Sequence, residues 1–323
     1  MRILLVSQFW PGPDDPDLGA FLVPVVDALR ERGHDVEVVA VDRRGAGRAG
    51  DLRLARESVR ARADVVFAHF LVPAAFIAAV THPRTPLVAM AHGQDVRNAI
   101  ASAPLRRATA FVARRAHTVI FNSAYLRDTM PAAVKRAEVI DLGVDLERFR
   151  GGERGDEPGG PVFLFAGSLI ERKNLVRLRD AFEALGRGTL VVLGDGPLRA
   201  ELEGRPGIRL VGRVPHDEVP GWIAKCDALV LPSLEEPLGQ VLLEAMASER
   251  SVVATKVGGP PGFVTPQAGA LVDPLSVDSI RAGLEHAASL PTPNAAAREA
   301  AALHALPRQV ERMEAVLAAA ARV

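Results

Sequence analysis

The chain has 323 residues, of which 48% are hydrophobic and 24% charged, and its 39 basic residues balance its 39 acidic residues. This length is enough for two ordinary domains with substantial cores. A net charge of zero gives no general attraction for nucleic acid, so we expect no nucleic-acid partner. The single cysteine, Cys226, excludes a disulfide framework and a thiolate metal site, and we interpret it as a small apolar residue just before a strand.

The first half of the chain alternates short apolar runs with helical patterns. "RILLVS" at residues 2–7 predicts a strand, and residues 21–33 predict a helix that ends at Gly33. Further strands are predicted over residues 35–41, 64–70, 86–92 and 117–123. Because these runs are almost continuously apolar, they are typical of parallel strands covered on both faces. Residues 1–150 therefore predict a doubly wound α/β domain.

The segment "RGGERGDEPGGP", residues 150–161, interrupts this pattern with charged residues and glycines and predicts a linker. The pattern then restarts over residues 151–305, which predict a second doubly wound domain. Its strands are expected at residues 162–168, 189–195, 208–212, 227–233 and 251–255. Residues 306–323 predict a final helix that packs back on the first domain.

The first residues, "MRILLVSQFWPG", hold too short an apolar run for a signal peptide, and no run of about 20 apolar residues occurs. We therefore expect a cytoplasmic protein. Residues 103–117 carry four arginines on a predicted helix, which we interpret as a solvated basic face. Peripheral contact with the inner face of a membrane remains an alternative.

Six loops rich in glycine, proline or charged residues follow predicted strands. They lie at residues 91–95, 167–174, 194–197, 212–218, 232–248 and 258–262. Any one of them fits an ordinary turn between strand and helix. Together they mark the edge at which open α/β sheets bind ligands.

The order of these motifs resembles retaining glycosyltransferases of family 4, also described as group 1. The most specific part is "EPLGQVLLE", in which Glu236 and Glu244 are separated by seven residues that include Gly239. The resemblance implies an α/β GT-B fold, with two doubly wound Rossmann-like domains facing across a cleft. Closure about the 150–161 hinge would exclude water from this cleft.

The same resemblance implies the reaction. A hexosyltransferase-like enzyme would move a sugar from a nucleotide-diphosphate-sugar donor to a hydroxyl of an unidentified acceptor, with retention of configuration. The acceptor class stays open between a small molecule, a glycan and a lipid-linked molecule. The nucleotide sugar is a co-substrate, and neither a further cofactor nor a metal ion is expected.

Site roles follow residue by residue from the resemblance. Glu236 and His92 are the expected catalytic residues, both directed at the donor sugar, and Glu244 is expected to bind the ribose. A helix is expected to begin near Gln240, where free N–H groups and the helix dipole suit a diphosphate. Gly239 lets the backbone approach the ligand closely. Glu235 is interpreted as solvent-exposed, and Asp95 as the cap of a helix.

Charge on the diphosphate requires cations. Lys173 matches the family's lysine, whereas Ser168 stands where the family has an arginine. Two interpretations stay open: Arg172 supplies the missing cation, or the donor binds more weakly. Gly19 in the first loop is expected near the donor phosphates or the acceptor, and the base near residues 212–214. The full predicted donor-binding set is Gly19, Ser168, Arg172, Lys173, Gly212, Val214, Leu238, Gly239, Gln240 and Glu244.

Two alternatives remain. One is a sugar-nucleotide epimerase on the same fold, against which the paired glutamates argue. The other is a catalytically weak partner or binding subunit, motivated by departures from the family pattern at Ser168, Leu142 and Gly262. The dinucleotide-like "GAGRAG" at residues 45–50 is interpreted as a flexible loop, because it does not follow the first strand. The sequence does not identify the base, the sugar, the acceptor or the oligomeric state.

Overall fold

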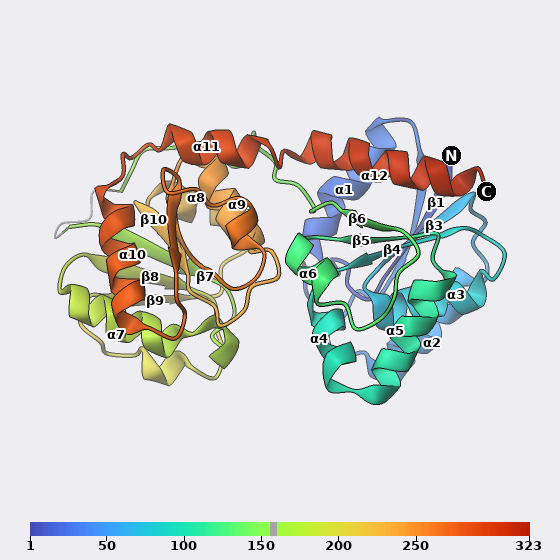
Figure 1. The fold of residues 1–323 in the computed structure, drawn as a ribbon, viewed down its shortest axis with the longest axis horizontal. Coiled ribbons are helices and arrows are strands. Elements are labelled where there is room, and N and C mark those ends of the chain that lie inside the picture. Colours follow the sequence, from blue (N-terminus) through green and yellow to red (C-terminus); the bar gives the residue numbers. More distant parts are fainter. Residues whose placement is uncertain (156–159) are drawn as a thin grey trace. The chain divides into compact units, whose positions relative to one another are not determined.

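The computed structural model describes residues 1–155 and 160–323, which form two compact units (Figure 1). Unit 1 comprises Met1–Gly143 and Leu306–Val323, and unit 2 comprises Val144–Ala305. The chain passes between the units after Gly143 and again after Ala305. The boundary predicted after residue 150 is therefore placed too late.

The predicted hinge at residues 150–161 is also wrong in position, because its described residues belong to unit 2. Gly155 donates its backbone N–H to the carbonyl of Lys225, and Arg154 forms an ion pair with Asp227 at 2.7 Å. Residues 156–159 of the predicted hinge lie outside the described residues. Glycine and charge alone do not distinguish a linker from a surface loop attached to one domain.

Unit 1 is built on a parallel sheet of six strands in the order β2-β1-β3-β4-β5-β6. The strands are β1 (Arg2–Ser7), β2 (Asp35–Ala40), β3 (Val65–His69), β4 (Leu87–Ala91), β5 (Thr118–Phe121) and β6 (Ala137–Val139). Five of these six runs were predicted. The short edge strand β6 was missed because its residues are mostly exposed and carry no apolar run.

Helices cover both faces of this sheet, as its continuously apolar strands require. They are α1 (Val23–Glu31), α2 (Gly47–Ser58), α3 (Phe76–Thr81), α4 (Gln94–Ala101), α5 (Ala103–Arg115), α6 (Ala124–Asp128) and α12 (Leu306–Ala321), with a π-helical turn at Leu71–Ala75. Successive strand residues enter opposite cores: Leu4 packs with helices α2, α3 and α5, whereas Leu5 packs with α1 and α12. The loop predicted at residues 45–50 is partly wrong, because α2 begins at Gly47.

The final helix, α12, belongs to unit 1 and lies beside α1 (Figure 1). Its buried face repeats at helical spacing through Val310, Met313 and Leu317, all fully buried in the core beneath the sheet. Glu314 on the same helix forms an ion pair with Arg32 and a hydrogen bond with His34, both just after α1. The end of the described chain thus completes the core of the unit in which the chain begins.

Unit 2 has a second parallel sheet of six strands, in the order β12-β11-β10-β7-β8-β9. The strands are β7 (Val162–Ala166), β8 (Thr189–Leu193), β9 (Ile208–Gly212), β10 (Ala228–Leu231), β11 (Ser251–Thr255) and β12 (Gly269–Val272). Taking β7 as the first strand, this order is that of the Rossmann fold. Strands β8 and β9 are added on one side of β7 and strands β10 to β12 on the other, so the strand order reverses between β7 and β10. β12, an edge strand, was not predicted.

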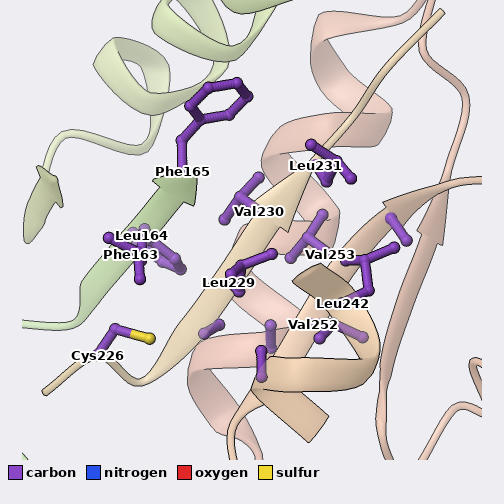
Figure 2. Packing of buried hydrophobic residues seen from close by; sticks show 14 of the residues in the cluster. Phe163, Leu164, Phe165, Cys226, Leu229, Val230, Leu231, Leu242, Val252 and Val253 are labelled. Atoms are coloured by element: carbon purple, nitrogen blue, oxygen red, sulfur yellow. The ribbon is translucent and has the colours of Figure 1, made fainter. Parts of the chain in front are cut away.

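The helices of unit 2 are α7 (Leu175–Leu185), α8 (Val219–Ala224), α9 (Gln240–Ala247), α10 (Val277–Ser289) and α11 (Ala295–Ala302), with 3-10 turns at Glu171–Lys173, Arg199–Glu201 and Pro260–Gly262. Figure 2 shows the core in which Leu242 of α9 packs near Leu229 of β10 and Val252 of β11. Cys226 is buried just before β10, as predicted, and burial raises the pKa of its thiol to about 12. This rigid core fixes the loops that leave the carboxyl ends of β7 and β10.

Candidate functional site

The reversal of strand order in unit 2 brings together two loops that are far apart in the sequence. β7 and β10 are neighbours in the sheet, and the connections that follow them leave in opposite directions. Open α/β sheets bind ligands in the crevice that such a reversal creates at the carboxyl edge. The loop after β7 carries Lys173 and the loop after β10 carries Glu236, and these two side chains meet.

Glu236 is the centre of this contact. Its Oε2 atom accepts hydrogen bonds from Lys173 Nζ at 2.7 Å and from Ser233 Oγ at 3.0 Å. Arg172 Nη1 lies 3.6 Å from the same oxygen. Burial alone would raise the pKa of Glu236, but the two cations and the hydroxyl outweigh it, so the pKa lies below its ordinary value. Glu236 is therefore an ionised, oriented carboxylate.

Arg172 is the candidate for the second cation beside Lys173 that a donor diphosphate would require. Its Nη1 atom donates to the carbonyl of Glu235 at 3.0 Å, while its own carbonyl accepts from the backbone N–H of Leu234. Arg172 is thus held beside Lys173 against the β10 loop. Ser168, at the position of the family's arginine, is exposed. Glu235 is half-buried, so its interpretation as a solvent-exposed residue is wrong.

The backbone of Glu236 is held by the "GGPPG" loop after β11. Glu236 donates its N–H to Val257 O at 3.1 Å and accepts from Gly259 N at 2.9 Å. A Cβ atom on Gly258 would lie 1.9 Å from the carbonyl oxygen of Glu236, and Gly258 has φ +123°. The role of this loop in holding Glu236 was not predicted from the sequence. Its glycines let two backbones pass at a distance that any side chain would prevent.

Helix α9 begins at Gln240, as predicted, directly after Gly239. Gly239 is left-handed, with φ 86°, and as a glycine it has no side chain with which to cap the helix. The positive end of the helix dipole lies at this point. Leu238 is buried in the core, so any contact it makes with a ligand would come from its backbone.

Glu244 lies in the second turn of α9 and is 8% exposed. Burial raises its pKa to about 7, and the charge of Arg148 opposes this rise. Arg148 Nη2 donates to the carbonyl and to Nδ1 of His216, both at 2.8 Å. No role was predicted for Arg148 from the sequence; only the fold places it near Glu244.

The loop after β9 carries the residues predicted to lie near the base. Gly212 ends β9 with φ 93° and accepts a hydrogen bond from Gly194 N at 2.7 Å. Val214 is half-buried against the core of unit 2. Gly194 packs so closely on the loop after β7 that a Cβ would lie 2.0 Å from Gly167 O. The "GDGP" motif therefore supports the loop that carries Lys173.

His92 lies in unit 1, directly after β4, and forms a pair with a histidine that the sequence analysis missed. His69 is the last residue of β3, which is the neighbour of β4 in the sheet, and is fully buried. His69 Nδ1 lies 3.0 Å from His92 Nε2. Burial lowers the pKa of His92 to about 3 and that of His69 well below its usual value. Both rings are therefore neutral at physiological pH.

Aromatic rings enclose this histidine pair. The ring of Phe70 lies 4.3 Å from that of His92, between centroids, and the ring of Phe21 lies 5.6 Å from it. Phe70 has φ 72°, which is uncommon for a residue with a bulky side chain. Gly19 begins the turn that contains Phe21, and a Cβ on Gly19 would lie 2.7 Å from the carbonyl of Phe9. The predicted residue Gly19 thus begins the turn whose Phe21 ring lies beside the ring of His92.

Asp95 holds the loop that carries His92. Its carboxylate accepts backbone N–H groups of Leu71, His92, Gly93 and Val96 at 2.9–3.1 Å. Burial raises the pKa of Asp95, while these four hydrogen bonds act in the opposite direction. Its prediction as the N-cap is wrong, because Gly93 occupies that position and Asp95 lies in the first turn of α4.

The structure thus places the predicted residues in two groups. Gly19 and His92 belong to unit 1 and lie in loops after its strands. The remaining predicted residues belong to unit 2 and lie at the end of a strand, in the loops after its strands or in the first two turns of α9. Among residues 1–155 and 160–323, no group of three or more histidine, cysteine, aspartate or glutamate side chains has the arrangement of a metal site. No helix in this described part is both long enough and apolar enough to span a membrane.

Two family models match the chain. The one described as "Glycosyl transferases group 1" matches residues 160–289, and the one described as "Glycosyltransferase Family 4" matches residues 47–148. Together they match most of both units.

Curated relatives agree with these models. A Bacillus subtilis (strain 168) glycosyltransferase named for teichuronic acid biosynthesis is 29% identical over 235 residues, which are 67% of this chain and 59% of that protein. An uncharacterised glycosyltransferase of Methanocaldococcus jannaschii is 30% identical over 205 residues, which are 61% of this chain and 57% of that protein. The chain therefore matches less than two thirds of the length of these relatives.

Among solved structures, that of Anabaena HepE in complex with UDP matches 99% of this chain and 100% of its own, with a TM-score of 0.75 and 21% identity. At this identity the match shows the fold. The fold, the two family models and the curated relatives agree. The chain belongs to the family 4, or group 1, glycosyl transferases and has their two-domain GT-B fold.

Proposed function

We propose that the chain transfers a sugar from a nucleotide-diphosphate-sugar donor to a hydroxyl of an acceptor, with retention of configuration at the sugar. The transfer requires neither a metal ion nor a cofactor besides the donor. The observation that carries this proposal is the ionised Glu236, held by Lys173 and Arg172 in the loop that leads into α9. The structural neighbour HepE, described in complex with UDP and with UDP-glucose, supports a donor of this class.

The donor site combines fixed positive charge with a carboxylate. The ammonium group of Lys173, the guanidinium of Arg172 and the first amides of α9 attract a diphosphate. As the bond between the sugar and the diphosphate breaks, charge develops on the departing oxygen, and these same groups stabilise it. The carboxylate of Glu236 is ionised and can accept hydrogen bonds from hydroxyl groups of the donor sugar.

Retention is proposed to occur on one face of the sugar. The bond from the anomeric carbon to the diphosphate oxygen breaks, and the bond to the acceptor oxygen forms on the same side. The acceptor proton passes to the departing diphosphate oxygen, so no separate protein base is needed. Glu236 is already engaged by Lys173 and Ser233, and both histidines are neutral, with His92 having a pKa of about 3. These features agree with a mechanism in which the leaving group acts as the base.

A thermal-shift panel of nucleoside diphosphates and their sugars tests the donor site. A ligand at 100 times its Kd adds about 2.7 kcal/mol to the free energy of unfolding. We expect one base to raise Tm and Lys173→Ala to abolish the rise. Lys225→Ala is the matched control, because Lys225 is exposed in the same unit and lies before β10, at the other end of the strand. Equal shifts in both variants would contradict the proposed site.

The stereochemistry and the metal requirement are tested with the donor that this panel identifies. NMR of the anomeric proton in the product should show the configuration of the donor, and a chelator should leave kcat unchanged. An inverted product would refute the same-face mechanism. The alternative of a weak binding subunit is favoured by Ser168, exposed where the family carries an arginine. That alternative gains if no nucleotide changes Tm at millimolar concentration.

A further inference from the structure

The histidine pair of unit 1 has an asymmetry that the proposed reaction does not yet use. His69 is fully buried at the end of β3, and its Nδ1 atom contacts His92 Nε2. His69 Nε2 is buried and has no hydrogen-bond partner among the residues that the structure describes. His92 is only partly buried, and the described residues offer no hydrogen bond to its Nδ1 atom.

A neutral imidazole carries one proton, so the 3.0 Å contact has two possible directions. If His92 Nε2 donates, His69 Nδ1 is the acceptor and the proton of His69 sits on Nε2. That choice buries an N–H group without a partner, which proteins avoid. If His69 Nδ1 donates, only a lone pair remains on the buried Nε2 atom, which is the less costly arrangement.

We propose that His69 is a positioning residue that donates its Nδ1–H to His92 Nε2 and so fixes His92 as the Nδ1–H tautomer. His92 then presents an N–H donor, and not a lone pair, to the ligand. The group that it contacts must be an acceptor, such as a hydroxyl oxygen of the donor sugar. The identity of this ligand rests on the proposed function; the tautomer does not.

The surroundings of the pair support this assignment. Phe70 stacks against His92 at 4.3 Å with planes 33° apart, and Phe67 lies 4.3 Å from His69. Asp95 accepts the backbone N–H of His92 and so fixes the start of the side chain. These contacts fix the position of the His92 ring. They do not determine which of its two nitrogens carries the proton. His69 settles that choice.

The tautomer is measured directly by long-range ¹H–¹⁵N NMR of the histidine rings in the ¹⁵N-labelled full chain. Spectra of the wild type and of His92→Gln assign the resonances of His92. We expect protonated Nδ1 and unprotonated Nε2 for His92. A protonated Nε2 would overturn the proposal. This result does not depend on whether the chain transfers a sugar.

Two variants then measure the consequence. His69→Leu removes the donor, and His69→Asn restores an N–H group near the position of Nδ1. With the donor found by the thermal-shift panel, we expect His69→Leu to lower kcat about tenfold, which is about 1.4 kcal/mol in the activation barrier. We expect His69→Asn to recover most of kcat, and both variants to keep the thermal shift with nucleoside diphosphate.

The control is His82→Leu, which removes another buried histidine of unit 1, one whose Nε2 contacts the carbonyl of Ser58. It should lower Tm without lowering kcat at a temperature where the chain is folded. Equal kcat in His69→Leu and wild type, or equal losses in His69→Leu and His69→Asn, would overturn the positioning role. If no donor binds, the proposed function fails while the NMR result still decides the tautomer.

Discussion

Replacing Gly258 with alanine tests whether the loop after β11 sets the position of Glu236. A Cβ at this residue would lie 1.9 Å from the Glu236 carbonyl oxygen, whereas contacts of a real Cβ are essentially never under 3.0 Å. The obstructing atom is backbone, so the loop after β10 must move by about 1 Å. A displacement of this size at a reacting group lowers kcat by about 100-fold.

The same substitution has a cost in stability, because Gly258 has φ +123°, where other residues are strained. We expect a loss of about 1–3 kcal/mol in the free energy of unfolding. For a unit of this size, each 1 kcal/mol lowers Tm by about 2–4 °C. Calorimetry measures this loss, and initial rates at 25 °C, where the variant remains folded, measure kcat.

Gly262→Ala is the matched control, since it lies in the same loop and a Cβ there meets no atom within 4 Å. Its stability should stay within about 0.5 kcal/mol of the wild type, with kcat unchanged. Binding of free nucleoside diphosphate should survive in Gly258→Ala, because Lys173 and the start of α9 remain. Equal kcat for Gly258→Ala and Gly262→Ala would refute the reasoning.

Two further predictions concern stability. Because burial raises the pKa of Glu244 to about 7, the folded chain keeps a proton that the unfolded chain releases, and stability should fall as pH rises from about 4.5 to about 7. Glu244→Gln should therefore be about 2–3 kcal/mol more stable than the wild type at pH 8 and similar to it at pH 4.5. The control is Glu203→Gln at an exposed position, which should match the wild type at both pH values. Parallel pH profiles of stability for the wild type and Glu244→Gln, measured by urea denaturation, would contradict the raised pKa of Glu244. Met313→Ala in α12 should lower the free energy of unfolding by about 2–5 kcal/mol, because Met313 is fully buried in the core of unit 1. The control, Glu311→Ala at an exposed position of the same helix, should change it little. Equal free energies of unfolding for the two variants in chemical denaturation would show that α12 does not stabilise the unit.

Local patterns were sufficient for much of the fold. Continuous apolar runs gave ten of the twelve strands, because a strand covered on both faces needs apolar residues throughout. The start of α9 at Gln240 followed from Gly239 and the apolar residues after it. The edge strands β6 and β12 were missed, since a strand with one neighbour and an exposed face carries a weaker signal.

The division of the chain into units needed tertiary contacts. Residues 150–155 look like a linker in composition, yet Arg154 and Gly155 are bound to unit 2 through Asp227 and Lys225. The final helix belongs to unit 1 because its apolar stripe completes a core that begins at β1. Composition reports solubility and local flexibility, and it does not report which distant surface a segment contacts.

The sequence by itself determined the residue types and the loops of the candidate site, through strand ends, glycines and the spacing of the paired glutamates. Only the tertiary structure decided which side chains meet. Lys173 and Glu236 are 63 residues apart and His69 and His92 are 23 apart, and each pair forms because two strands are neighbours in a sheet. Strand order is set by the burial of both sheet faces over a whole domain, and no local stretch of sequence contains it.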